Sequence, residues 1–203
     1  MYRRVNNEKR KVPKVAIAPV ENIGNERGVT LIEILVVIGI LAIIAGFSYP
    51  NFKEWLPSYR LKRAARNLFS DMQNTRINAI RSQSNWAIVF DTSNNRYIIC
   101  SSPGTDNNWT TLGDNTIEKT VNLSLYKSGI RYGHGNATSP YAGSFESDNV
   151  TFQNNMVIFT PRGILGSPTG YCYIENEKGA TYVIGALTTG VIMLRKWYGS
   201  SWK

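Results

Sequence analysis

The feature that most constrains this chain is one carboxylate, Glu33, near the start of an otherwise apolar run that reaches Tyr49. Burying an isolated carboxylate in hydrocarbon costs roughly 2.5 kcal/mol or more, so an acid at this place indicates a partner that neutralises it. The 21 residues from Val29 to Tyr49 would span ~31 Å as a helix, about the thickness of bilayer hydrocarbon. The sequence therefore predicts one membrane-spanning helix that carries an acid.

A counter-charge for Glu33 arises if the chain is cut between Gly28 and Val29. The new N-terminal ammonium would lie one helical turn from Glu33, and the ammonium of one copy could neutralise the carboxylate of a neighbour. Residues 1–28 hold seven Lys or Arg and three Glu, which is +4 of the formal net charge of +9 and leaves +5 for the rest. Positive charge before an apolar segment stays cytoplasmic, so the remainder is predicted to lie beyond the membrane.

A conventional secretory signal peptide is the alternative explanation of this N-terminus. Such a peptide would be removed together with its own apolar core. No small-x-small cleavage site is clear after residues 45–49, and the helical pattern continues beyond them. We therefore favour a cut that keeps the apolar helix in the mature chain.

The string Gly28-Val29-Thr30-Leu31-Ile32-Glu33 resembles the prepilin processing site of type IV pilins and type II secretion pseudopilins. Glu33 is then the fifth mature residue, and Pro50 is the twenty-second, where that family usually has a proline. The family usually starts its mature chain with Phe, whereas this chain has Val29. The resemblance implies cleavage by prepilin peptidase after Gly28, methylation of the new N-terminus, and assembly through Glu33 and Pro50.

Beyond Pro50 the pattern predicts an amphipathic helix over residues 51–84. Pro50 and Pro57 each remove an amide donor, so a kink or a locally melted stretch is expected between the two helical parts. The basic cluster of this helix is expected to be a solvated face or to contact anionic headgroups. The apolar positions are Leu61, Ala64, Ala65, Leu68, Phe69, Met72, Ala79 and Ile80, and the polar ones between them are Arg60, Lys62, Arg63, Arg66, Asp71 and Arg76.

From Asn85 the apolar period shortens to two, which predicts strands. Residues 86–90 and 97–99 form a predicted hairpin, and turn-rich segments cover 101–115 and 133–148. The fold class is therefore α+β, with one long helix laid across an antiparallel sheet. In domain terms we expect a cleaved cytoplasmic leader (1–28), a transmembrane and assembly helix (29–50), an amphipathic helix (51–84) and a β-rich domain (85–203). The further strand candidates are residues 121–126, 150–152, 157–160, 171–174, 181–186 and 191–196.

Cys100 and Cys172 are the only two cysteines, and both lie in strand-like runs. Disulfides form readily outside the cytoplasm, and two cysteines allow a single connectivity. A Cys100–Cys172 bridge is therefore predicted, with two separately buried free thiols as the alternative.

The segment Phe159-Thr160-Pro161-Arg162-Gly163, followed by Gly170 and a hairpin-like run, resembles the end of the GspH/FimT group of the same superfamily. A strand followed by a Pro turn and a Gly would give the same string in many β domains. In some FimT-like pilins a basic motif after a Gly binds DNA, but here Gly190 is followed by the apolar residues 191–194. We expect a short solvated tail rather than a base-stacking surface, formed by Arg195, Lys196, Trp197, Tyr198, Trp202 and Lys203.

His134 is the only histidine and sits in a Gly-rich turn with no nucleophile or metal-ligand motif beside it. No GxGxxG string or P-loop is present for nucleotide chemistry. The sequence therefore predicts no enzyme, no catalytic residue, no cofactor and no metal site.

These observations, together with the resemblance, predict a minor pseudopilin of type II secretion that helps to drive protein export. The alternative is a FimT/FimU-like minor type IV pilin involved in pilus assembly, adhesion or DNA binding. The implied partners are sister pilins, prepilin peptidase and the inner membrane, while DNA is not favoured. The implied location is the bacterial inner membrane, crossed once, with the C-terminal domain in the periplasm and the subunit assembled in a pilus or pseudopilus.

Overall fold

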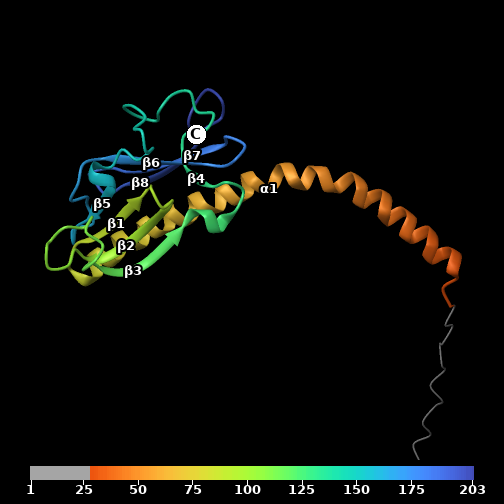
Figure 1. Cartoon of the computed structure of the whole chain (residues 1–203), viewed down its shortest axis with the longest axis horizontal. Coiled ribbons are helices and arrows are strands. Elements are labelled where there is room, and N and C mark those ends of the chain that lie inside the picture. Colours follow the sequence, from red (N-terminus) through yellow and green to blue (C-terminus); the bar gives the residue numbers. More distant parts are fainter. Residues whose placement is uncertain (1–27) are drawn as a thin grey trace, which may run out of the picture. The chain divides into compact units, whose positions relative to one another are not determined.

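The computed structural model describes residues 28–203, without the side chains of residues 47–53. The predicted leader therefore lies outside the described residues except for Gly28. The chain divides after Ile44 into two compact units, Met1–Ile44 and Ala45–Lys203. The second unit contains all the strands (Figure 1).

Helix α1 runs from Leu31 to Ser82, which is 52 residues, and contributes to both units. Its backbone stays helical at Pro50 and Pro57, so the locally melted stretch that the sequence suggested does not form. A proline removes only its own amide donor, and the hydrogen bonds on either side of it can hold the helix together. The helix ends where Gln83 turns to φ 53°, and the side-chain amide of Gln83 donates from Nε2 to the Ile80 carbonyl over 2.7 Å.

One antiparallel sheet has the strand order β3-β2-β1-β5. Its hairpin joins β1 (Trp86–Asp91) to β2 (Arg96–Ser102), as the sequence predicted, and pairs Ile88 with Ile99. Strand β5 (Met156–Phe159) pairs with β1, and β3 (Thr116–Asn122) pairs with β2. The strand β3 therefore forms one edge of this sheet (Figure 1).

The second antiparallel sheet has the order β4-β6-β7-β8. Its central strands are β6 (Gly170–Glu175) and β7 (Thr181–Ala186), and they are flanked by β4 (Arg131–Tyr132) and β8 (Ile192–Lys196). The predicted strands at 171–174, 181–186 and 191–196 are thus confirmed, with a shift of a residue at some ends.

Two predicted strands are largely wrong. Most of the segment 121–126 is the 3-10 helix η1 (Leu123–Tyr126), because the Asn122 side chain caps it by accepting from the Ser124 amide over 3.1 Å. The segment 150–152 contributes only an isolated bridge between Val150 and Cys172, and the 3-10 helix η2 (Gln153–Asn155) follows it.

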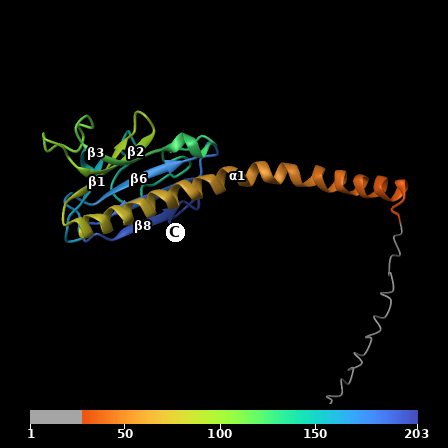
Figure 2. The same ribbon diagram turned by 90° about the horizontal axis from the view of Figure 1, so that it is seen from below.

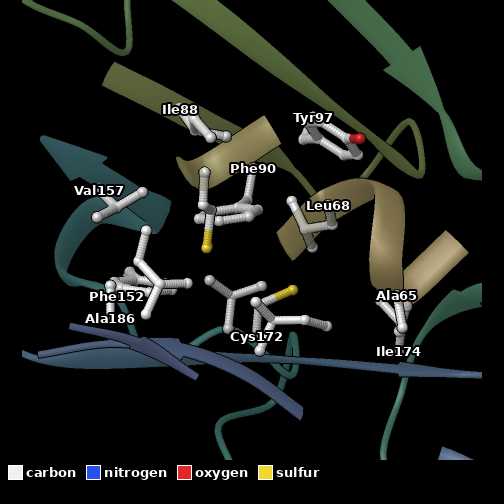
Figure 3. Close-up of a cluster of buried hydrophobic side chains, with 14 of the residues drawn as sticks. Ala65, Leu68, Ile88, Phe90, Tyr97, Phe152, Val157, Cys172, Ile174 and Ala186 are labelled. Atoms are coloured by element: carbon white, nitrogen blue, oxygen red, sulfur yellow. The ribbon is translucent and has the colours of Figure 1, made fainter. Parts of the chain in front are cut away.

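The C-terminal half of α1 packs against both sheets and forms the main core (Figures 1 and 2). The helix contributes a fully buried face, and alternate residues of the strands face it, as Figure 3 shows for part of the cluster. Each large aliphatic side chain buried in this way contributes about 1.5–3 kcal/mol. The helix side of the core consists of Leu61, Ala64, Ala65, Leu68, Met72 and Ala79.

Asp71 belongs to this buried surface, although the pattern placed it among the solvated residues of α1. It is 7% exposed, accepts from the Tyr97 hydroxyl over 2.7 Å and forms an ion pair with Lys119 at 2.7 Å. Burial, followed by the hydrogen bond to Asp71, raises the pKa of the Tyr97 hydroxyl above its usual range. The carboxylate is tolerated because both of its oxygens have partners, which periodicity alone does not reveal.

The predicted Cys100–Cys172 bridge does not form, and both cysteines are buried free thiols. Successive strand residues point to opposite faces of a sheet. Cys100 lies in a smaller cluster with Ala87 and Ile98, whereas Cys172 lies in the main core (Figure 3). The 102–115 loop supplies Trp109 to the smaller cluster. Burial raises the pKa of both thiols, which keeps them protonated.

We predict that both thiols resist iodoacetamide in the folded protein, because burial and protonation suppress their reaction. After unfolding in denaturant without a reductant, intact-mass analysis should show two alkylated cysteines. A protein that takes up no reagent until it is reduced would contradict the structure.

Candidate functional site

The N-terminal end of α1 presents the residues of the processing motif. Gly28, Val29 and Thr30 are exposed and precede the helix, which begins at Leu31. A Cβ placed on Gly28 meets no atom within 4 Å. No described residue therefore demands glycine at this position.

Glu33 lies in the first turn of α1. Its amide donates to the Thr30 hydroxyl over 3.3 Å and to the Thr30 carbonyl over 3.1 Å, so Thr30 is the N-cap of the helix. A carboxylate in the first turn is stabilised by the partial positive charge of the helix N-terminus. The string Thr30-x-x-Glu33 is a capping-box signature that the sequence analysis did not use, and it would have placed the helix start.

Apart from Glu33, the described part of α1 before residue 47 is apolar, and it is exposed on every side. Leu31 is 81% exposed and Leu41 58%. A helix that is apolar all round is stable only in an apolar environment, so this surface requires lipid or other subunits.

Within residues 28–46 and 54–203, no helix is long and apolar enough to cross a membrane. The predicted span, 29–49, extends into residues whose side chains lie outside the described set. The side chain of Pro50 lies outside it as well.

At the other end of α1, an arginine side chain of the helix binds the backbone of the segment that resembles the GspH/FimT group. The Arg76 guanidinium donates to the Gly163 carbonyl over 2.7 Å. Gly190, at φ 83°, lies so close that a Cβ on it would stand 2.0 Å from the same carbonyl oxygen. Arg76 therefore joins α1 to the loop after β5, and the turn between β7 and β8 packs closely against this contact. The sequence offered no signal for this contact, since Arg76 appeared as one of several polar helix residues.

The basic residues near the start of the packed half of α1 are mostly solvated, as expected. Lys62, Arg63 and Arg66 are exposed, and Arg60 is half-buried and donates to the Ser128 hydroxyl over 2.9 Å. Arg60 and Arg63 border a groove between α1 and the segment β3–η1.

His134 has a structural place in the second unit. Its ring stacks on Phe145 with centroids 4.1 Å apart, and Nδ1 lies 2.8 Å from the Asn149 amide oxygen. In the part of the chain that the structure describes, no group of three or more His, Cys, Asp or Glu side chains could hold a metal ion.

The C-terminal residues are folded, so the expected solvated tail is wrong. Trp197 is 7% exposed and forms a bridge with Trp202, whose indole donates to the Ser139 carbonyl over 3.0 Å. Two further hydrogen bonds tie the amide and carbonyl of Lys196 to those of Lys203. Burial of the tryptophan rings stabilises this folded-back C-terminus. The two rings pack against each other within the domain.

Two family profiles match the sequence of this chain. The profile described as "Prokaryotic N-terminal methylation motif" matches residues 23–49. The profile described as "Type II transport protein GspH" matches residues 64–189, which cover the packed part of α1 and the strands from β1 to β7. The chain belongs to the GspH family.

Two solved structures are similar to this chain. The minor pseudopilin EpsH from the type 2 secretion system of Vibrio cholerae has 14% identity and a TM-score of 0.44, over 66% of this chain and 95% of that one. The type IV minor pilin FimU of Pseudomonas aeruginosa has 13% identity and a TM-score of 0.48, over 73% of this chain and 96% of that one. A comparison with curated proteins gives no match.

Membership of the GspH family makes this a pilin-like α+β protein with a structural, non-enzymatic role. The methylation motif and the family together imply processing by prepilin peptidase, anchoring in the inner membrane and assembly with other pilins.

The Arg76–Gly163–Gly190 contact predicts unequal effects of two Gly→Ala substitutions. Gly190→Ala should lower the free energy of unfolding by about 3 kcal/mol or more, because strain at positive φ adds to the clash with the Gly163 carbonyl. Gly143→Ala is the matched control, since Gly143 has φ 68° but no atom within 4 Å of an added Cβ. It should cost only about 1–2 kcal/mol. Urea unfolding of the full chain in detergent measures both, and equal losses would contradict the contact.

Proposed function

We propose that this protein is a minor pseudopilin of a type II secretion system, similar to the H subunit, that enters an inner-membrane pseudopilus and helps to drive protein export. The observation that carries the proposal is the order of two profiles in one chain. A methylation motif at 23–49 precedes a GspH match at 64–189.

The distribution of apolar surface supports this role. The second half of α1 buries its apolar face within its own domain, whereas residues 31–46 find no such cover in the part of the chain that the structure describes. Before assembly, lipid would cover these side chains, and in a fibre the equivalent helices of other subunits would do so. One continuous helix thus serves as membrane anchor, fibre core and part of the globular domain.

Processing would occur between Gly28 and Val29 and remove residues 1–28 as a cytoplasmic leader. The exposure of both residues and their position ahead of the helix support this proposal, because a peptidase needs an accessible, non-helical bond. Cleavage would leave the ammonium of Val29 within two residues of the first helical residue, Leu31.

Glu33 would dock a new subunit by pairing with the N-terminal ammonium of a neighbour. The partial charge of its own helix N-terminus offsets some of the cost of burying this carboxylate, and the ammonium would supply the rest. Pro50 would contribute to assembly by weakening the hydrogen bonding of α1 between its two halves.

We predict that Gly28→Leu blocks processing without disturbing the fold, because a side chain at this position meets nothing. Intact-mass analysis of membrane protein should find the wild-type chain starting at Val29 and the variant at full length. Gly39→Leu is the matched control and should be processed, since Gly39 is equally open and lies beyond the motif. A wild-type chain cut after Ser48 would refute the pilin-type N-terminus.

We also predict that Glu33→Gln is inserted and cleaved but fails to assemble. Losing one partner of a buried ion pair costs roughly 3–5 kcal/mol, so co-purification with sister subunits should fall about tenfold or more. Glu54→Gln is the control, because Glu54 is an exposed acid of the same helix outside the apolar run. Recovery of Glu33→Gln at wild-type levels would remove the assembly role of the carboxylate.

The identity of the co-purified subunits tests the proposed apparatus. Type II secretion pseudopilins are expected, identified by mass spectrometry. Type IV pilins in their place would assign the protein to the FimT/FimU-like alternative.

A further inference from the structure

A basic groove lies between α1 and the segment formed by β3 and η1. Its volume is about 550 Å³. Arg60, Arg63 and Asn67 line it from the helix, and Lys119, Tyr126 and Lys127 line it from the other side. We call it the α1–β3 groove.

The charges of this groove are not balanced within the described part of the chain. Lys119 is already paired with Asp71, and Arg60 donates to the neutral hydroxyl of Ser128. Arg63 and Lys127 are exposed, and neither belongs to any of the three ion pairs found among the described residues. Cations that gather in a concave site without acids raise the local concentration of anionic partners.

The wall of the groove is also a free strand edge. Strand β3 pairs with β2 on one side, and no strand of residues 28–203 pairs with its other side. Thr120, Val121 and Asn122 of this strand line the groove. An edge strand presents backbone N–H and C=O groups that can pair with another extended chain.

An apolar side chain stands at the end of this edge. Leu125 of η1 lines the groove and is 77% exposed. A small anion such as phosphate would use only the cations. An extended peptide would use the cations, the strand edge and the leucine together.

We propose that the α1–β3 groove receives an extended acidic segment of a neighbouring subunit. The segment adds to the edge of β3 by backbone hydrogen bonding and directs its carboxylates at Arg63 and Lys127. This inference rests on the proposed function, because it takes the partner to be another subunit of the fibre.

A photocrosslinking experiment on the full chain, co-expressed with its sister subunits, tests the groove. Thr120→Cys provides an exposed thiol on the edge strand that lines the groove, while the two native cysteines are buried. Labelling with benzophenone maleimide, illumination and peptide mapping identify what lies against β3. The expected product joins position 120 to a segment of a sister subunit that is rich in Asp and Glu.

Charge variants made in the Thr120→Cys chain test the recognition. Arg63→Gln combined with Lys127→Gln should lower the crosslink yield about fivefold or more. Arg162→Gln combined with Lys178→Gln removes the same charge from two exposed positions that do not line the groove, and it should leave the yield unchanged. Lys119 is left intact, because removing it would strip the partner from the buried Asp71.

Each other outcome overturns the proposal at a different level. Co-purification with sister subunits but no crosslink at position 120 would refute the groove and leave the proposed function standing. A crosslink to phospholipid, or to a segment without acidic residues, would refute the acidic peptide as the occupant. Failure of even the unsubstituted chain to co-purify with sister subunits would refute the proposed function and the groove together.

Discussion

The burial of one face of α1 between the two sheets is the interaction on which this structure depends. The two sheets share one core that is built around the helix, because Leu61, Leu68 and Met72 are fully buried beside residues of both. The same helix continues to Leu31, so the packed face and the exposed apolar run belong to one element. Removing the helix would uncover the inner faces of both sheets at once, and no other described element could replace it.

Polar contacts fix α1 against the domain where apolar packing alone would permit sliding. Asp71 binds Tyr97 and Lys119 of the first sheet, and Arg76 holds the Gly163 carbonyl at the far end of the helix. These contacts use directional hydrogen bonds and so define one register of the helix. Because Asp71 is buried in these contacts, its negative charge does not neutralise the cations on the exposed surface of the helix. The cations nearer the anchor are left to face solvent and the α1–β3 groove.

The two halves of α1 both carry apolar surface, but within the described residues only the C-terminal half buries it in its own chain. Its C-terminal half covers its apolar stripe with strands of its own chain, while residues 31–46 leave theirs exposed. Glu33 fits this second environment because Thr30 caps the helix beside it and the helix N-terminus favours negative charge. Membership of the GspH family implies anchoring in the inner membrane and assembly with other pilins.

Local patterns in the sequence determined the processing motif, the helical and strand periodicities and the α+β class, because each of these depends on residues close together in the chain. Tertiary structure alone decided the state of the cysteines, since Cys100 lies in the smaller cluster on the first sheet and Cys172 enters the main core from the second sheet. It also decided that Asp71 is buried and that the C-terminal tryptophans fold back. The α1–β3 groove joins residues about 60 positions apart. Such features depend on which distant residues come into contact. The periodicity of a single segment does not predict those contacts.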